Sequence, residues 1–188
     1  VIGQRTFIIA RRITIPQRDL HRRYGLIIRL PRIGKNGKKI DVYKFRTMYP
    51  YAEFVQQYVF EKNSLSQGGK IKNDPRITSY GRFFRRIWID ELPMFINLLK
   101  GEMKLIGVRP LSKHYFGLYT KELQEKRTKF KPGLLPPFYA DMPKTLDEIQ
   151  ASEMKYLLKC EKNGVFVTDF KYFWNILFNI VFRKARSN

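Results

Sequence analysis

The stretch DELPMFINLLKG, residues 90–101, carries the most structural information in the chain. Proline is tolerated in the first turn of a helix and glycine favours its end, so Pro93 and Gly101 suit the two ends of one helix. Four apolar residues between them follow helical spacing, at i, i+3, i+4 and i+7: Leu92, Phe95, Ile96 and Leu99. The pattern predicts a helix with Asp90 and Glu91 at its N-terminus.

A second helix is predicted directly before this one. Thr78 or Ser79 can cap its N-terminus, because short hydroxyl side chains accept hydrogen bonds from the first free amides. The helix is expected to end before Asp90, with basic residues Arg82, Arg85 and Arg86 and an apolar side made of Phe83, Phe84 and Ile87.

Residues 26–49 predict a β-hairpin. Residues 26–30 and 39–45 are strand-like, and residues 34–37 between them have the glycine and asparagine typical of a turn. Five basic residues crowd the hairpin: Arg29, Arg32, Lys35, Lys38 and Lys39. They form either a solvated basic face or contacts to an anion, and the sequence leaves both open.

The other patterns predict helices near residues 51–63, 118–129 and 146–161, and a short buried strand at residues 105–108. Residues 131–143 contain four prolines and are expected to form a structured loop. With 188 residues the chain suits one domain, so the predicted fold class is α+β, a single mixed domain over residues 1–188, mainly helical with a small basic β-hairpin. Residues 1–23 are a possible remnant of an upstream segment.

The charge of the chain indicates an anionic partner. A formal net charge of +21 comes from 37 Lys and Arg against 16 Asp and Glu. Nucleic acid, an anionic membrane surface and a phosphorylated substrate all fit such a charge. The single Cys160 excludes an internal disulfide and a cysteine zinc cluster, which suits a reducing compartment.

The C-terminal residues predict a long apolar helix. Lys171, Asn175, Asn179 and Arg183 recur every four residues among aromatic and aliphatic side chains, which predicts one narrow polar stripe. No stretch reaches about 18 uninterrupted apolar residues, so a membrane-spanning helix is not expected. The helix either lies in a membrane interface or packs on the domain as a core helix, and the lack of charge between Lys171 and Arg183 favours the core.

The carboxylate pair at residues 90 and 91 suggests phosphate chemistry. Helix N-terminal amides and arginine side chains attract phosphate oxygens, and a carboxylate beside them is either a metal ligand or a covalent nucleophile. The alternative is helix capping, for which Asp and Glu are also favoured. The surrounding residues help to decide between phosphate chemistry and helix capping.

Several short motifs follow one another in a fixed order: Lys44-Phe45-Arg46-Thr47-Met48, Asp74-Pro75-Arg76-Ile77-Thr78, Gly81-Arg82-Phe83-Phe84-Arg85, Asp90-Glu91-Leu92-Pro93, Asn97-Leu98-Leu99-Lys100-Gly101-Glu102-Met103, Arg109-Pro110 and Lys131-Pro132-Gly133. Together they closely resemble the bacterial sugar transferase family, the monotopic phosphoglycosyl transferases. The resemblance covers about residues 24–188 and is most specific between residues 44 and 110.

The resemblance implies a two-step transfer. Asp90 matches the family's nucleophile, which attacks the β-phosphate of a UDP-sugar, releases UMP and passes the phosphosugar to a polyprenyl phosphate such as undecaprenyl phosphate. Glu91 matches its neighbour, and both carboxylates are implied ligands of Mg²⁺. Basic positions around the phosphates match Lys44, Arg85 and Arg109, with Arg82 and Arg46 as further candidates. The implied place is the cytoplasmic face of a bacterial inner membrane, in exopolysaccharide, capsule or glycoconjugate assembly.

Departures from the family pattern leave alternatives. Trp88-Ile89, Met94, Val108 and Leu135-Pro136 replace residues that are usual in the family, which predicts a changed substrate preference around residues 131–141. The family's N-terminal re-entrant helix is missing from this sequence, so a membrane anchor or further domain upstream of Val1 is one possibility and a non-catalytic membrane-surface or scaffold relative another. A nucleic-acid-binding module would leave the carboxylate pair unexplained, and no RNP, KH or zinc pattern is present.

Overall fold

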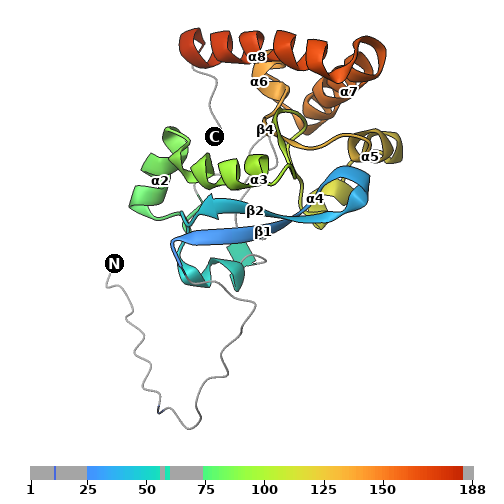
Figure 1. Ribbon diagram of the computed structural model, residues 1–188. Coiled ribbons are helices and arrows are strands. Elements are labelled where there is room, and N and C mark those ends of the chain that lie inside the picture. The colour runs from blue at the N-terminus through green and yellow to red at the C-terminus, as the bar shows by residue number, and fades with distance from the viewer. Residues whose placement is uncertain (1–10, 12–24, 56–57, 60–73, 184–188) are drawn as a thin grey trace.

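The structure is a computed structural model that describes residues 11, 25–55, 58–59 and 74–183 (Figure 1). Expectations for the first 23 residues, for residues 60–73 and for the basic C-terminal tail lie outside this part. The described chain is mainly helical with two small two-stranded sheets, which is compatible with the α+β prediction. Its helices of at least one α-turn are α2 Ser79–Arg86, α3 Phe95–Leu99, α4 Lys113–Gly117, α5 Lys121–Thr128, α6 Phe138–Asp141, α7 Leu146–Asn163 and α8 Val165–Phe182.

The predicted hairpin is confirmed. Strands β1 Ile27–Ile33 and β2 Lys39–Phe45 pair antiparallel, joined by the 3₁₀ turn η1 Lys35–Gly37. Asn36 and Gly37 have φ of 57° and 70°, the left-handed region that asparagine and glycine tolerate best. The hairpin lies against the short 3₁₀ helix η3 Ile89–Met94, which carries the carboxylate pair.

Helix α2 confirms the predicted cap. The Thr78 hydroxyl accepts a hydrogen bond from the Gly81 amide at 3.0 Å. The apolar side of the helix is largely exposed, since Phe83 and Ile87 keep 55% and 47% of their accessible surface. Gly81 faces inward instead, where a Cβ atom would meet the Thr47 carbonyl oxygen at 2.1 Å.

The helix predicted from residues 90–101 is formed in two pieces. Trp88 has φ of 60°, an unusual left-handed conformation for a bulky residue, and it separates α2 from η3. The chain then continues as η3 and α3, and Gly101 with φ of 68° ends the segment as expected. The carboxylate pair therefore lies in a 3₁₀ turn and not in the first turn of a regular α-helix.

Residues 131–143 are more regular than predicted, because tertiary pairing overrides the four prolines. Strand β4 Gly133–Leu135 pairs parallel with β3 Lys104–Ile106, and α6 follows. The two backbones approach closely, since a Cβ atom on Gly133 would lie 2.1 Å from the Gly107 nitrogen. The strand predicted at 105–108 is confirmed, shifted by one residue at its start.

The remaining helices follow the predictions with small shifts. Helix α7 begins where expected, capped by Thr145, and α5 begins three residues late, capped by Thr120. Helix α4 was not predicted. After Pro50 the chain forms a 3₁₀ turn, η2 Pro50–Glu53, and the rest of the helix expected to residue 63 is described only in part.

Helices α7 and α8 form an antiparallel pair at one end of the molecule (Figure 1). The main core lies where they meet α5, α6 and β3, and a smaller one lies under the hairpin around Val42, Met94, Met103 and Leu134. By length and composition α8 is apolar enough to cross a membrane, although core helices also meet this criterion. The count of uninterrupted apolar residues in the sequence did not identify it. The predicted core position is wrong for most of its apolar side chains, which are exposed.

Candidate functional site

The carboxylate pair meets the hairpin at the centre of the described structure. Asp90 is buried in η3, with 8% of its surface exposed. Its neighbour Glu91 accepts a hydrogen bond from Lys44 of β2, with 2.5 Å between Nζ and Oε1. Residues 47 positions apart in the sequence are thus brought together, and the fold places Lys44 beside the carboxylate pair as predicted.

Burial sets the electrostatics of the pair. Desolvation raises the pKa of Asp90, the negative charge of Glu91 raises it further, and the charges of Lys44 and Arg85 oppose the shift. Desolvation also lowers the pKa of Lys44, against the attraction of Glu91. An incompletely compensated carboxylate beside basic side chains is suited to receive an electrophilic phosphate group.

Arg85 reaches the site from α2. Its Nε donates to the Thr47 hydroxyl at 3.0 Å, and Thr47 in turn accepts hydrogen bonds from Thr78 through its carbonyl. The close approach of Gly81 to Thr47 lets α2 lie near enough for this contact. Desolvation lowers the pKa of Arg85, and attraction to Asp90 is the largest opposing influence.

The charge of Arg109 acts on the other basic side chains of the site. Its positive charge lowers the pKa of Lys44 and of Arg85, in each case after the larger effect of desolvation. It has the same effect on Arg32, again after desolvation. Asp90 and Glu91 offset only part of the charge of these four cations, so the cluster fits a phosphate-bearing ligand.

Arg32 was not among the predicted site residues. Pairing of Ile28 with Lys44 and of Arg32 with Ile40 puts Arg32 and Lys44 on the same face of the hairpin, because side chains alternate along a strand. The sequence does contain a hint of this. Arg32 follows Leu26, Ile28 and Leu30 at every second position, so it is a basic residue on an otherwise apolar face of the strand. Without the register it could not be told from the four other basic residues of the hairpin.

For two other predicted residues the described contacts lie elsewhere. Arg82 is exposed on α2, and the interactions described for Asp90 and Glu91 do not include it. The Nε atom of Arg46 donates to the Gly25 carbonyl at 3.1 Å, so this side chain fastens the base of the hairpin.

Asn97 holds the hairpin onto the helical segment. It is fully buried, donates to the Asp41 carbonyl at 2.7 Å and accepts from the Tyr43 amide at 3.1 Å. Its amide also donates to Glu102 at 2.6 Å. These contacts fix β2 against α3 and therefore fix the distance between Lys44 and the carboxylate pair.

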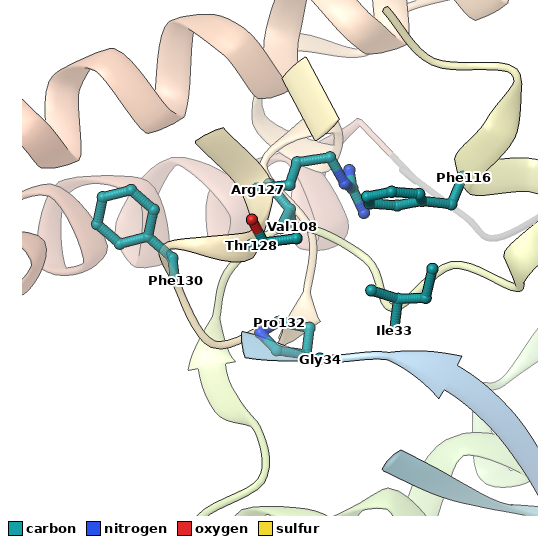
Figure 2. A pocket seen from close by; sticks show the side chains of 8 residues that line it. All are labelled: Ile33, Gly34, Val108, Phe116, Arg127, Thr128, Phe130 and Pro132. Carbon is teal, nitrogen blue, oxygen red and sulfur yellow. The ribbon is translucent and has the colours of Figure 1, made fainter. Parts of the chain in front are cut away.

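A buried ion pair supports Arg109 from the other side. Arg127 at the end of α5 pairs with Glu153 of α7, and its Nη2 donates to the Arg109 carbonyl at 2.5 Å. Figure 2 shows Arg127 extending towards Phe116 above the end of the hairpin at Ile33. The pocket drawn there measures about 10 Å³, room for one water at most, so it is no substrate site.

The outer side of η3 and α3 is apolar and open. Half or more of the surface of Leu92 and Phe95 is exposed, and Leu99 keeps 89%. The helical apolar spacing that predicted this helix therefore does not mark a buried face. An apolar surface begins one residue after Glu91, at the edge of the charged site.

The donor set of the site suits a hard cation in part. Among the described residues no three His, Cys, Asp or Glu side chains gather closely enough to hold a metal ion. Mg²⁺ binds through one or two carboxylates together with substrate phosphate oxygens, so the pair Asp90 and Glu91 fits it once a phosphorylated substrate is present. A cation there would also offset the charge of the desolvated Asp90.

The family model of the bacterial sugar transferases matches residues 7–183. The chain belongs to this family. The resemblance seen in the motifs is thereby confirmed, and in the bacterial sugar transferases of known name the matched region recurs within longer proteins.

Three such relatives show the range of names. Galactosyl transferase CpsE of Streptococcus agalactiae serotype III is 41% identical over 104 residues, covering 55% of this chain and 23% of that protein. Undecaprenyl-phosphate galactose phosphotransferase of Salmonella typhimurium is 36% identical over 108 residues, covering 55% and 22%. UDP-glucose:undecaprenyl-phosphate glucose-1-phosphate transferase of Escherichia coli K12 is 33% identical over 157 residues, covering 82% and 30%. The chain spans less than a third of the length of each.

Proposed function

We propose that the chain is the catalytic part of a phosphoglycosyl transferase, which moves a phosphosugar from a UDP-sugar to a membrane polyprenyl phosphate such as undecaprenyl phosphate. The observation that carries the proposal is the buried Asp90, adjacent to the Lys44–Glu91 pair and coupled to Arg85. Family membership and the names of the relatives support it. The place of action would be the cytoplasmic face of a bacterial inner membrane, in exopolysaccharide, capsule or glycoconjugate assembly.

The first step uses Asp90 as nucleophile. A carboxylate oxygen forms a bond to the β-phosphorus of the UDP-sugar, and the bond from that phosphorus to the bridging oxygen breaks, so UMP leaves with this oxygen. Arg85 and Arg109, together with Arg32, are positioned to neutralise the phosphate oxygens. Lys44 donates a hydrogen bond to Glu91, and its positive charge offsets negative charge around the reacting phosphorus.

The second step returns the carboxylate. A phosphate oxygen of the polyprenyl phosphate attacks the same phosphorus, the bond to Asp90 breaks, and the phosphosugar leaves on the lipid as a diphosphate. Asp90 and Glu91 would hold Mg²⁺ together with the donor phosphates, and the ion would stabilise their negative charge. The two-step path needs only one phosphorus site, which agrees with a single cluster of basic residues around Asp90.

The experiment that tests the proposal measures UMP release from a panel of UDP-sugars with Mg²⁺ and polyprenyl phosphate in detergent. We expect UMP release that requires Asp90, and a mass increase of one phosphosugar on Asp90 when the acceptor is left out. If the full-length protein, supplied with lipid, releases no UMP from any donor, the proposal is wrong. The alternative, a non-catalytic scaffold protein of the same fold, then replaces it.

The pH dependence of UMP release should reveal the environment of Asp90. The carboxylate must be ionised to attack, so the rate falls as the pH decreases through its pKa, which burial raises. Because Glu91 raises this pKa and Lys44 lowers it, Glu91→Gln should move the acid limb to lower pH and Lys44→Met to higher pH. Single-turnover rates across pH provide the measurement, and acid limbs that stay fixed in both variants would exclude Asp90 as the titrating group.

The open apolar side of η3 and α3 suits an isoprenoid acceptor. We expect Phe95→Ser to raise the KM for a long-chain polyprenyl phosphate about tenfold, since partial burial of such a side chain contributes about 1.5 kcal/mol. UMP release without acceptor and the KM for a short, water-soluble acceptor should not change. The matched control is Leu118→Ser, an equally exposed apolar residue beyond α4. Equal effects on long and short acceptors would contradict this assignment.

A further inference from the structure

Helix α8 leaves most of its apolar side chains exposed. Its buried side includes the polar residues Thr168 and Asn179, and Asn179 donates to the Tyr139 and Ala140 carbonyls at 3.0 and 2.7 Å. Its outer side is apolar and open, with Phe166, Phe170, Trp174, Phe178, Val181 and Phe182 all more than half exposed. An aromatic face of this size on one helix is unfavourable in water, so it indicates an apolar surrounding.

The helix cannot cross a membrane in this fold. Its inner side packs on α6 and α7 over about three turns, through Thr168, Tyr172, Ile176 and Asn179. A helix fixed lengthwise to a polar protein body can bring only one side to the lipid. The geometry therefore favours an orientation parallel to a membrane surface, with Trp174 in the middle of the contacting face.

A basic cavity adjoins this face. Helices α6, α7 and α8 enclose about 240 Å³ between them, lined by Lys155, Lys159 and Asn163 of α7 and by Lys171, Tyr172 and Asn175 of α8. One acidic residue, Asp141, also lines it and pairs with Lys155 at 3.1 Å. Lys171 and Asn175 are one turn apart and exposed, so they form the border between the cavity and the apolar face.

One of the residues that line the cavity carries an unsatisfied donor. Tyr172 is 4% exposed, and its hydroxyl has no hydrogen-bond partner among the described residues. Lys159 lies over its ring at 5.3 Å from the centroid. Burial raises the pKa of Tyr172 to about 12, so the hydroxyl keeps its proton at neutral pH and can donate. Buried polar groups without a partner are rare, and a bound ligand would resolve this one.

We propose that this cavity binds the phosphate-bearing head group of an anionic membrane lipid while the outer face of α8 lies among the acyl chains. Three lysines against one aspartate match the charge of such a head group, and the apolar face matches the chains attached to it. The site is separate from the Asp90 cluster, whose described contacts involve none of these residues. The inference rests on the proposed function only in that both place the chain at a membrane.

The test is binding of the whole chain to phosphatidylcholine vesicles with and without phosphatidylglycerol, measured by flotation without any sugar donor. Turnover plays no part, so failure here leaves the proposed reaction untouched. We expect Lys159→Gln/Lys171→Gln to weaken binding to the anionic vesicles about 10- to 30-fold, since each basic residue at an anionic surface contributes about a factor of five. The matched control, Lys35→Gln/Lys121→Gln, removes two exposed lysines outside the cavity and should weaken binding less than about threefold.

A second pair of variants tests the apolar face. Trp174→Ser/Phe178→Ser should abolish flotation, whereas Leu26→Ser/Leu118→Ser, which removes equally exposed side chains elsewhere, should retain it. In the unmodified chain, lipids brominated on their acyl chains should quench the fluorescence of Trp174, and Trp174→Phe should remove that quenching. This last measurement does not depend on whether the serine variants fold.

Three results would overturn the inference. Equal weakening by the cavity and control lysine pairs would mean that diffuse charge alone attracts the chain. Absence of acyl-chain quenching would mean that α8 does not enter the lipid. Inorganic phosphate that binds with dependence on Lys159 and Lys171, in a chain that ignores vesicles, would assign the cavity to a free phosphate ligand.

Discussion

Asp90→Asn is expected to lower the rate of UMP release by about 10⁴-fold or more, because an amide cannot form the acyl phosphate that carries the sugar. The loss should appear in the first turnover both with and without acceptor, since the first step is already blocked. The phosphosugar mass adduct should disappear as well. UMP release at a rate near that of the unmodified chain would show that Asp90 is not the nucleophile.

The same variant should fold at least as well as the unmodified chain. For an acid whose folded-state pKa is raised, stability is greatest below the unfolded pKa and falls as pH rises through the folded one. At neutral pH the charge of Asp90 therefore costs stability, and the neutral amide removes that cost. Asp147→Asn, an exposed carboxylate in the first turn of α7, is the matched control and should change neither activity nor the unfolding temperature.

Arg127→Met is expected to lower the free energy of unfolding by about 3–5 kcal/mol, because it leaves the charge of Glu153 buried without its partner. Urea denaturation followed by circular dichroism measures this loss. The control is Lys126→Met, one residue earlier, whose pair with Glu161 lies near the surface and should be worth about 1 kcal/mol or less.

The double variant Arg127→Met/Glu153→Leu separates stability from positioning. Apolar replacement of both partners of a buried pair is often neutral, so most of the lost stability should return. The hydrogen bond from Arg127 to the Arg109 carbonyl is still missing, so the rate of UMP release should stay low while the fold recovers. Recovery of both together would show that Arg127 does not position Arg109.

The site is an example of charge held in place by packing. Lys44, Arg85 and Arg109 come from a strand, a helix and a loop, and each is anchored by a neighbour that carries no chemistry of its own. Thr47 anchors Arg85, Asn97 anchors the strand of Lys44, and the Arg127 pair anchors the chain at Arg109. These contacts keep the basic side chains close together in the folded state despite their mutual repulsion, so an anion can bind among them.

Local sequence determined the hairpin, the positions of most helices and the Thr78 cap, and the resemblance to the family predicted that Asp90, Glu91, Lys44, Arg85 and Arg109 belong to one site. Helical spacing, turn residues and caps act over a few residues, and the ordered motifs carry the grouping. What spacing cannot tell is which side of a helix meets the protein. The apolar spacing of α2 and α3 thus predicted helices, but it did not show that Phe83 and Leu99 stay exposed.

Only the tertiary structure decided the rest. The hairpin register aligned Arg32 with Lys44, parallel pairing with β3 turned a proline-rich segment into β4 and α6, and contact with α6 buried Asn179 while α8 kept its aromatic side open. Each outcome depends on a partner distant in sequence, and a pattern read along one segment contains no information about that partner. The free energy that selects the buried face comes from the surface it meets.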